Sequence, residues 1–172
     1  MLLDYLAEKY SLKMIPSKND YFYCEGKLNN SEYSLIKPST YVNNSGIAAL
    51  AAVNHYNVDV TELLVVHDDI NLDISVIKTK ISGGDGGHNG LNSIIYHLIS
   101  DQFPRIRIGI GNNFRQGEMA DFVLSDFNSE EKPKLDEIIK TAAFLSEEFI
   151  KGGIKQLLDA NSKLSNMKNE NL

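Results

Sequence analysis

Hydrophobic and polar residues follow two different periods along this chain, and together these periods predict a mixture of helices and strands. Residues 2–10 have the spacing of an amphipathic helix, and residues 45–55 are rich in alanine and also predict a helix. Residues 21–26 and 32–36 alternate as strands do, and Lys37 before a proline ends the second run.

The rest of the chain continues this mixture. Three further runs predict strands, at residues 63–66, 74–81 and 105–110, the first being the continuous apolar run of a buried central strand. Helical spacing predicts helices over residues 91–98 and from an N-cap at Ser129 to about Lys151, before a glycine pair and a last short helix. The sequence therefore predicts an α/β fold, with a mixed, largely parallel sheet and helices on both faces.

Composition agrees with one globular domain over residues 1–172, with a frayed polar tail at 166–172. Of the 172 residues, 42% are hydrophobic and 23% are charged, which is ordinary for such a domain. No apolar run reaches the roughly 18 residues of a membrane span, and the start lacks the features of an export signal. The single cysteine, Cys24, favours a reducing cytoplasm, and we expect a monomer.

The net charge of −6 argues against a protein that binds nucleic acid by overall charge alone. Residues 78–115 nevertheless carry a local excess of lysine and arginine over aspartate. Such a local patch can contact phosphate groups even when the whole chain is acidic.

The most informative segment is GGDGGHNG at residues 83–90, which lies between a predicted strand and a predicted helix. Glycines in such number indicate positive φ angles or a close approach of backbone to a ligand. The spacing fits neither a dinucleotide fingerprint nor a Walker loop, because Asn89 replaces the third glycine and no Lys-Ser or Lys-Thr pair follows. The loop therefore offers His88 and Asn89 to a ligand.

Polar residues elsewhere converge on the same edge of the predicted sheet. Asp68 and Asp69 follow a strand, and the turn at residues 39–46 precedes a helix. Ligands collect at the carboxyl ends of strands in such folds, so we expect a site with amide groups, a carboxylate and an aromatic ring.

Four motifs carry a family resemblance: YVNNSG (41–46), VHDD (66–69), GGDGGHNGL (83–91) and FPRIRIGIG (103–111). In this order and spacing they closely resemble bacterial peptidyl-tRNA hydrolase. The resemblance implies hydrolysis of the ester between a peptide and the 3′ end of tRNA, which recycles tRNA from stalled translation products. It implies contact with the acceptor stem and 3′ end of peptidyl-tRNA, no metal and no cofactor.

The resemblance also assigns roles to residues. Asp68 matches the aspartate that orients a general-base histidine, and His88 matches a second histidine near the site. The substrate-binding aromatic and its two asparagines match Tyr41, Asn43 and Asn89. The pair that clamps the 5′ phosphate of the tRNA matches Lys80 and Arg105.

One departure concerns the start of the chain. The family opens with a strand, a Gly-Asn-Pro-Gly turn and a Thr-Arg-His-Asn segment that carries the general base, whereas MLLDYL here resembles the helix that follows them. The resemblance therefore implies that the first strand and the general base are missing. Because general-base catalysis contributes about 10²- to 10⁴-fold, we expect impaired activity.

Three hypotheses remain open: a shortened version of an active hydrolase, a non-catalytic RNA-binding relative, and a remnant without function. Purely structural interpretations also remain for the site residues. Asn43 would cap a helix, Asp68 would be a turn carboxylate, and Lys80 and Arg105 would be solvated charges. His88 would support the loop by hydrogen bonding or act as a makeshift base. His67, next to Asp68 on a strand, faces the wrong way to be oriented by it.

Overall fold

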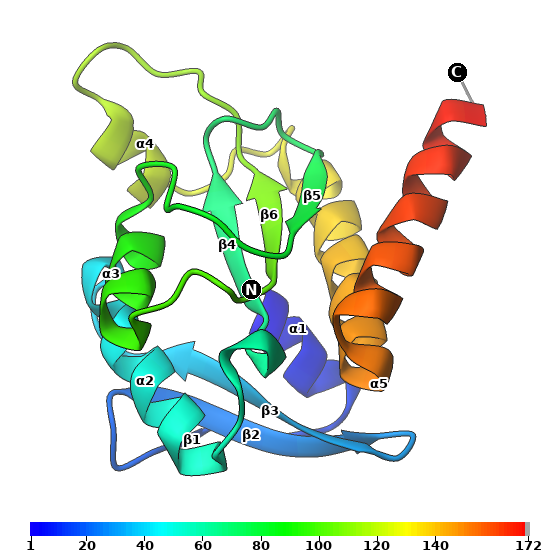
Figure 1. Cartoon of the computed structure of the whole chain (residues 1–172). Helices are drawn as coiled ribbons and strands as arrows, with labels where there is room; N and C mark the ends of the chain where they lie inside the picture. The colour runs from blue at the N-terminus through cyan, green and yellow to red at the C-terminus, as the bar shows by residue number, and fades with distance from the viewer. Residues whose placement is uncertain (171–172) are drawn as a thin grey trace.

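The structure of the chain, a computed structural model, describes residues 1–170 (Figure 1). Its elements are α1 (Leu2–Lys9), β1 (Ile15–Pro16), β2 (Tyr21–Leu28), β3 (Ser31–Pro38), η1 (Val42–Asn44), α2 (Ser45–Tyr56), η2 (Val60–Glu62), β4 (Val65–Asp69), β5 (Ile77–Lys80), α3 (Asn89–Leu98), β6 (Arg105–Gly109), α4 (Met119–Leu124) and α5 (Lys132–Glu170). The predicted helices and strands are all present within a few residues of the expected bounds. The two-residue β1 and the exposed α4 have too little periodicity to be predicted.

Two details at the C-terminal helix differ from expectation. Its N-terminal turn is held by Asn128 rather than Ser129, because the side-chain oxygen of Asn128 accepts hydrogen bonds from the N–H groups of Glu130 and Glu131. The helix also continues through Glu170, so residues 166–170 have helical backbone where the sequence predicts a frayed tail. The last two residues of that predicted tail lie outside the described residues.

The strands form two three-stranded sheets, in the orders β1-β2-β3 and β4-β6-β5. The α/β class is confirmed, but the prediction of a largely parallel sheet is wrong, because only β4 and β6 pair in parallel among the described strands. The chain passes from Asp69 to Ile77 by a short connection, which is too short to return to the other end of the sheet, so β5 cannot run in the same direction as β4. β5 therefore runs antiparallel to β6, and β6 rather than β4 is the central strand.

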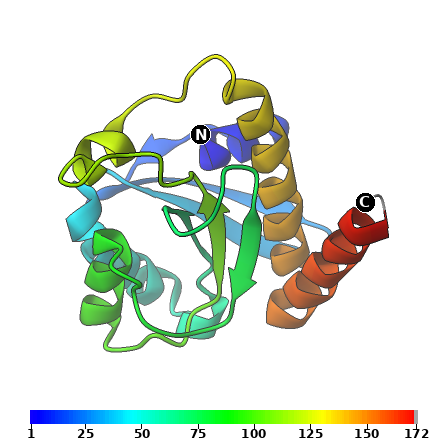
Figure 2. The same cartoon turned by 90° about the horizontal axis from the view of Figure 1, so that it is seen from above.

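Helices cover both faces of the β4-β6-β5 sheet, as predicted (Figure 1). Neighbouring residues of a strand point to opposite faces, so Val65 packs with the α2 and α3 side chains while Val66 packs with α1 and α5. The view from above also shows α2 and α3 on one side of this sheet and α5 on the other (Figure 2).

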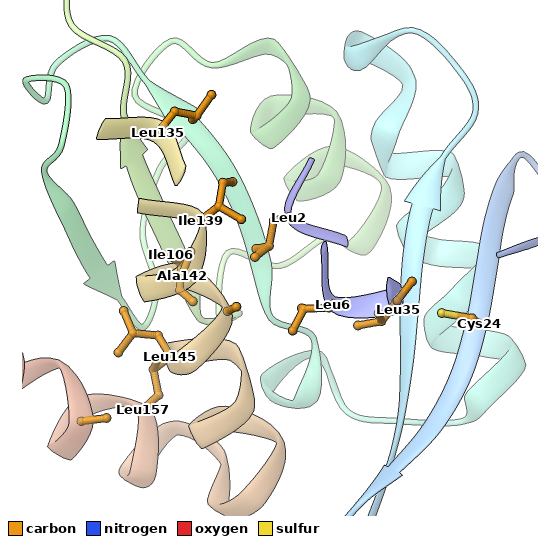
Figure 3. Close-up of a cluster of buried hydrophobic side chains, with 13 residues drawn as sticks. Leu2, Leu6, Cys24, Leu35, Ile106, Leu135, Ile139, Ala142, Leu145 and Leu157 are labelled. Atoms are coloured by element: carbon orange, nitrogen blue, oxygen red, sulfur yellow. The ribbon is translucent and has the colours of Figure 1, made fainter. Parts of the chain in front are cut away.

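A single hydrophobic cluster joins the two sheets. Leu2 and Leu6 of α1 lie between Leu35 of β3 and the side chains of α5 (Figure 3). After the non-helical Gly152 and Gly153, α5 folds back and its second segment adds side chains to the same cluster. The chain is therefore one domain. Among the described helices, none has the length and apolar character to cross a membrane.

The contact between α2 and α3 requires a glycine. A Cβ on Gly46 would lie 2.1 Å from the carbonyl oxygen of Ser93 and 2.5 Å from Nδ1 of His97. The N–H of Gly46 also donates to Oγ of Ser93 at 3.0 Å. The turn before α2 and the start of α3 both carry residues of the candidate site, so the close approach of these helices fixes how the two segments lie.

We expect Gly46→Ala to lower the free energy of unfolding by about 3 kcal/mol, since the added methyl group clashes with backbone and forces the helices apart. Urea unfolding measures this change. Gly84→Ala is the matched control, because a Cβ there has no atom within 4 Å, and it should change stability by less than about 0.5 kcal/mol. Equal stability of the two variants would contradict this account of the α2–α3 contact.

Candidate functional site

The two aspartates at the end of β4 have different surroundings. Asp69 is buried, accepts a hydrogen bond from the N–H of Asn71 at 2.8 Å and forms an ion pair with Arg107 at 2.7 Å. Asp68 faces His88 instead, with 3.3 Å between Oδ1 and Nε2. Asp69 therefore holds the turn after β4, and Asp68 is the carboxylate available for chemistry, so the interpretation of Asp68 as a turn carboxylate is wrong.

His88 connects that carboxylate to the start of α3. Its Nδ1 accepts a hydrogen bond from the N–H of Leu91 at 3.1 Å, which caps the helix. Its ring packs edge-on against His67, with 4.9 Å between ring centroids. Nδ1 of His67 lies 2.6 Å from the backbone oxygen of Asp68, not from the carboxylate. As predicted, His67 is not oriented by the Asp68 side chain.

Burial and hydrogen bonding set the charges of these groups. Burial lowers the pKa of His67 to about 4, so this ring is neutral at pH 7. For Asp68, burial acts to raise the pKa, but hydrogen bonding, chiefly from the His88 side chain, outweighs it and holds the pKa below its usual range. At neutral pH the site contains an ionised Asp68 beside uncharged His67.

The glycine loop adopts the backbone conformations that its sequence predicts. Gly83, Gly86 and Gly87 have positive φ angles of 118°, 61° and 84°. The carboxylate of Asp85 accepts hydrogen bonds from the N–H of Gly87 at 2.7 Å and from the Asn92 side chain at 2.8 Å. Asp85 therefore holds the loop against α3 and occupies one of the amides that the sequence offers to a ligand.

Arg105 lies beneath this loop rather than on the surface. Its side chain is 1% exposed, stacks on the Phe103 ring and donates to the carbonyl oxygens of Gly83 and Gly84. Burial lowers the pKa of its guanidinium, which these carbonyl dipoles hold in place. The interpretation of Arg105 as a solvated charge is therefore wrong, and its guanidinium is used to hold the glycine loop.

Arg107 belongs to the local basic excess predicted for residues 78–115, but the sequence assigned it no individual role. Arg107 lies two residues after Arg105 on β6, so the two side chains are on the same face of the strand, and the Arg107 side chain is 27% exposed. In the strand register Arg107 pairs with the exposed Lys78 of β5. Lys80 is also exposed, and a Cβ on Gly83 would lie 2.6 Å from its Nζ, so it borders the loop. Period-two alternation along β5 and β6 was the signal for this shared basic face.

The predicted aromatic and asparagine residues lie next to the start of α3. Tyr41 is 86% exposed, and Asn43 is exposed within η1. Their neighbour Val42 packs on Gly90, because a Cβ there would lie 3.0 Å from Cγ2 of Val42. Asn89, exposed at the first position of α3, is thereby close to the turn.

The alternative that Asn43 caps α2 is wrong. The residue at the N-cap is Asn44, and no side-chain hydrogen bond caps the helix there. The amide of Asn43 is therefore not used to start α2.

Asp68 also forms part of the wall of a cavity of about 150 Å³ between β4 and the α4 segment. Its wall is mixed, with the rings of Phe122 and Phe127 beside the carboxyl groups of Asp126 and Glu131. Among the residues that the structure describes, no group of three or more His, Cys, Asp or Glu side chains is arranged as metal ligands. The groups of the site are a carboxylate, imidazoles, amides and a phenol.

Comparison with known proteins gives one consistent result. The family model described as "Peptidyl-tRNA hydrolase" matches residues 1–170. The peptidyl-tRNA hydrolase of Thermoanaerobacter pseudethanolicus is 39% identical over 158 residues, which cover 92% of this chain and 85% of the relative. That of Clostridium botulinum strain Hall is 34% identical, covering 92% and 82%. The crystal structure of peptidyl-tRNA hydrolase from Acinetobacter baumannii matches with a TM-score of 0.85 and 29% identity, covering 92% of this chain and 81% of that one.

The low pKa of His67 predicts a pH dependence of stability. An unfolded histidine binds a proton below about pH 6.5, whereas folded His67 stays neutral until about pH 4. The unfolded state therefore binds more protons in this window, and stability falls as the pH falls through it, by about 3 kcal/mol from this residue.

His67→Phe keeps the aromatic packing and should remove this part of the loss when urea unfolding is compared at pH 7 and pH 4.5. His55→Phe, at an exposed position on α2, is the control and should keep the wild-type loss. The same pH dependence in wild type and His67→Phe would show that His67 is not responsible.

Proposed function

Because the chain belongs to the peptidyl-tRNA hydrolase family, we propose that it hydrolyses the ester between peptide and tRNA in peptidyl-tRNA and so returns tRNA to translation. One observation carries the proposal: two segments meet at the start of α3. The turn with Tyr41 and Asn43 packs there through Val42, and His88 links the same helix end to Asp68. Groups for binding and for polarising a substrate therefore lie together.

The exposed side chains near the start of α3 suit the two parts of such a substrate, the peptide and the terminal nucleotide of the tRNA. Asn43 and Asn89 each offer a donor and an acceptor, which matches the alternating groups of a peptide backbone. The exposed ring of Tyr41 offers a surface on which an unpaired base at the 3′ end of the tRNA can stack. We assign these three residues to the peptide and the terminal nucleotide.

The basic face of β5 and β6 suits the phosphate groups of the acceptor stem. Lys78 and Lys80 are exposed on β5, and Arg107 is partly exposed opposite Lys78. We therefore keep Lys80 in the proposed phosphate contact, together with Lys78 and Arg107, and assign Arg105 to holding the glycine loop. An acidic chain with this local patch can bind RNA in a salt-dependent way.

The reaction needs a base that takes a proton from water, and the four histidines of the chain are poorly placed for it. His55 is exposed on α2, and His97 bonds to the backbone oxygen of Ser93. His67 has one nitrogen on a carbonyl and the other fully buried. His88 uses both nitrogens. We therefore propose that the 172-residue polypeptide alone hydrolyses its substrate slowly.

The same observation favours a second candidate function, a non-catalytic relative that binds RNA. Such a protein would use the basic face and the exposed Tyr41, Asn43 and Asn89 without needing a base. For either function we propose a monomer acting in the cytoplasm, where peptidyl-tRNA is found.

A direct assay tests the enzyme. The purified 172-residue chain should release tRNA from peptidyl-tRNA about 10²- to 10⁴-fold more slowly than the Thermoanaerobacter pseudethanolicus relative measured beside it, because general-base catalysis is worth that much. Rates equal to those of the relative would contradict the proposed slow hydrolysis. Binding without any detectable release would favour the non-catalytic relative.

RNA binding tests the basic face. The double substitution Lys78→Ala and Lys80→Ala should weaken binding to a tRNA and reduce the slope of log affinity against log salt by about 2, since each lysine releases counterions. Lys27→Ala removes an exposed lysine from the β2–β3 hairpin and is the matched control. Equal effects of the two variants would place the RNA elsewhere.

A further inference from the structure

His88 is held on three sides. Its Nδ1 accepts from Leu91 in α3 and its Nε2 faces Asp68 in β4. Its ring packs against His67 on one side, and a Cβ on Gly90 would lie only 2.9 Å from its Cε1 on another. The imidazole therefore has one fixed position between the helix and the strand.

The cap determines which nitrogen carries the proton. A nitrogen that accepts a hydrogen bond from a backbone N–H uses its lone pair, so Nδ1 of His88 is unprotonated. The proton of the neutral ring then lies on Nε2, which donates to Oδ1 of Asp68. The ring has no lone pair left for a substrate, so it does not act as a makeshift base in this arrangement.

Capping alone does not explain a histidine at this position. Serine, threonine, aspartate and asparagine are the usual N-cap residues, and their side chains are short. In this structure the imidazole accepts at the helix and also donates to Asp68, whose Oδ1 lies 3.3 Å from Nε2. This second contact acts on a residue of the proposed active site.

We propose that His88 is a positioning residue, which fixes the Asp68 carboxylate relative to the first turn of α3 through one defined tautomer. This inference rests on the proposed function, because it concerns how that site is held together. Asp68 and Asn89 then form one rigid unit, with the carboxylate and the exposed amide kept at a constant separation. A carboxylate keeps a fixed position at a site only when it has a directional partner of its own, and His88 supplies that contact.

Titratable groups from several elements lie near this pair. His67 of β4 packs on the His88 ring, Asp85 of the glycine loop lies within reach of the charge of His88, and Asp126 and Glu131 share the cavity wall with Asp68. Asp85 and Asp69 are both bound to their own partners. A change at His88 should therefore be seen first at Asp68.

The test uses two substitutions in the full 172-residue chain. His88→Asn keeps a cap acceptor for Leu91 but is too short to reach Asp68, whereas His88→Ala removes both contacts. His97→Asn is the matched control, because it changes a histidine of the same helix that bonds to Ser93 rather than to Asp68. The first measurement is the titration of the Asp68 carboxyl carbon by ¹³C NMR, and the second is the protonation of the His88 ring nitrogens by ¹⁵N NMR in the wild type.

We expect the wild type to show a protonated Nε2 and an unprotonated Nδ1. In His88→Asn and His88→Ala the Asp68 titration should move to higher pH, because the carboxylate loses its donor, while His97→Asn should leave it unchanged. An unmoved Asp68 titration in His88→Asn, or a proton on Nδ1 in the wild type, would overturn the proposal. The ¹⁵N measurement decides the case even if both His88 variants fail to fold.

Neither measurement depends on turnover. A chain that does not hydrolyse peptidyl-tRNA but shows the expected tautomer and the expected shift at Asp68 contradicts the proposed function alone. A chain that hydrolyses its substrate and shows no shift contradicts only the role of His88.

Discussion

The glycine loop and everything it carries depend on one buried cation. The Arg105 guanidinium stacks on Phe103 and donates to the carbonyl oxygens of Gly83 and Gly84, so it joins the start of β6 to a loop that has little cohesion of its own. Glycines at positive φ allow the loop to turn but contribute no side chains that would hold it. A planar guanidinium with several N–H donors can hold such a loop, because it donates to several carbonyl groups at once. The carbonyl dipoles also stabilise its charge while it is buried.

From this anchored loop the constraints pass to the site through α3. Asp85 ties the loop to the helix through Asn92, and His88 begins the helix and contacts Asp68. On the other side of α3, the close approach at Gly46 fixes α2 and the turn before it. Residues far apart in the sequence are thus held by short, directional contacts around one helix end. Such an arrangement suits the proposed binding of peptidyl-tRNA at a fixed point, since little ordering remains to be done on binding.

The two neighbouring acids show how a fold separates similar residues. Asp69 points to Arg107 and the turn after β4, while Asp68 points to His88. Alternation along a strand sends their side chains in opposite directions, so one stabilises the structure and the other is left for chemistry. The same alternation separates Arg105 from the isoleucines beside it, and it gives β5 and β6 a shared basic face. Arg105 is buried although it alternates with isoleucines as an exposed residue would, because burial depends on what packs above a strand, here the glycine loop, and not on the strand's own pattern.

The sequence by itself determined the α/β class, the helices and strands to within a few residues, and the positive φ angles of the loop, because these follow from local periodicity and from the conformational freedom of glycine. It also placed Asp68, His88, Asn89 and the turn at Tyr41 in one region, and the family it indicated is the one that the comparisons give. Only the tertiary structure decided that β5 is antiparallel, that Arg105 is buried and Arg107 exposed, and which nitrogen of His88 carries a proton. These depend on contacts between distant segments, whose energies no local pattern encodes.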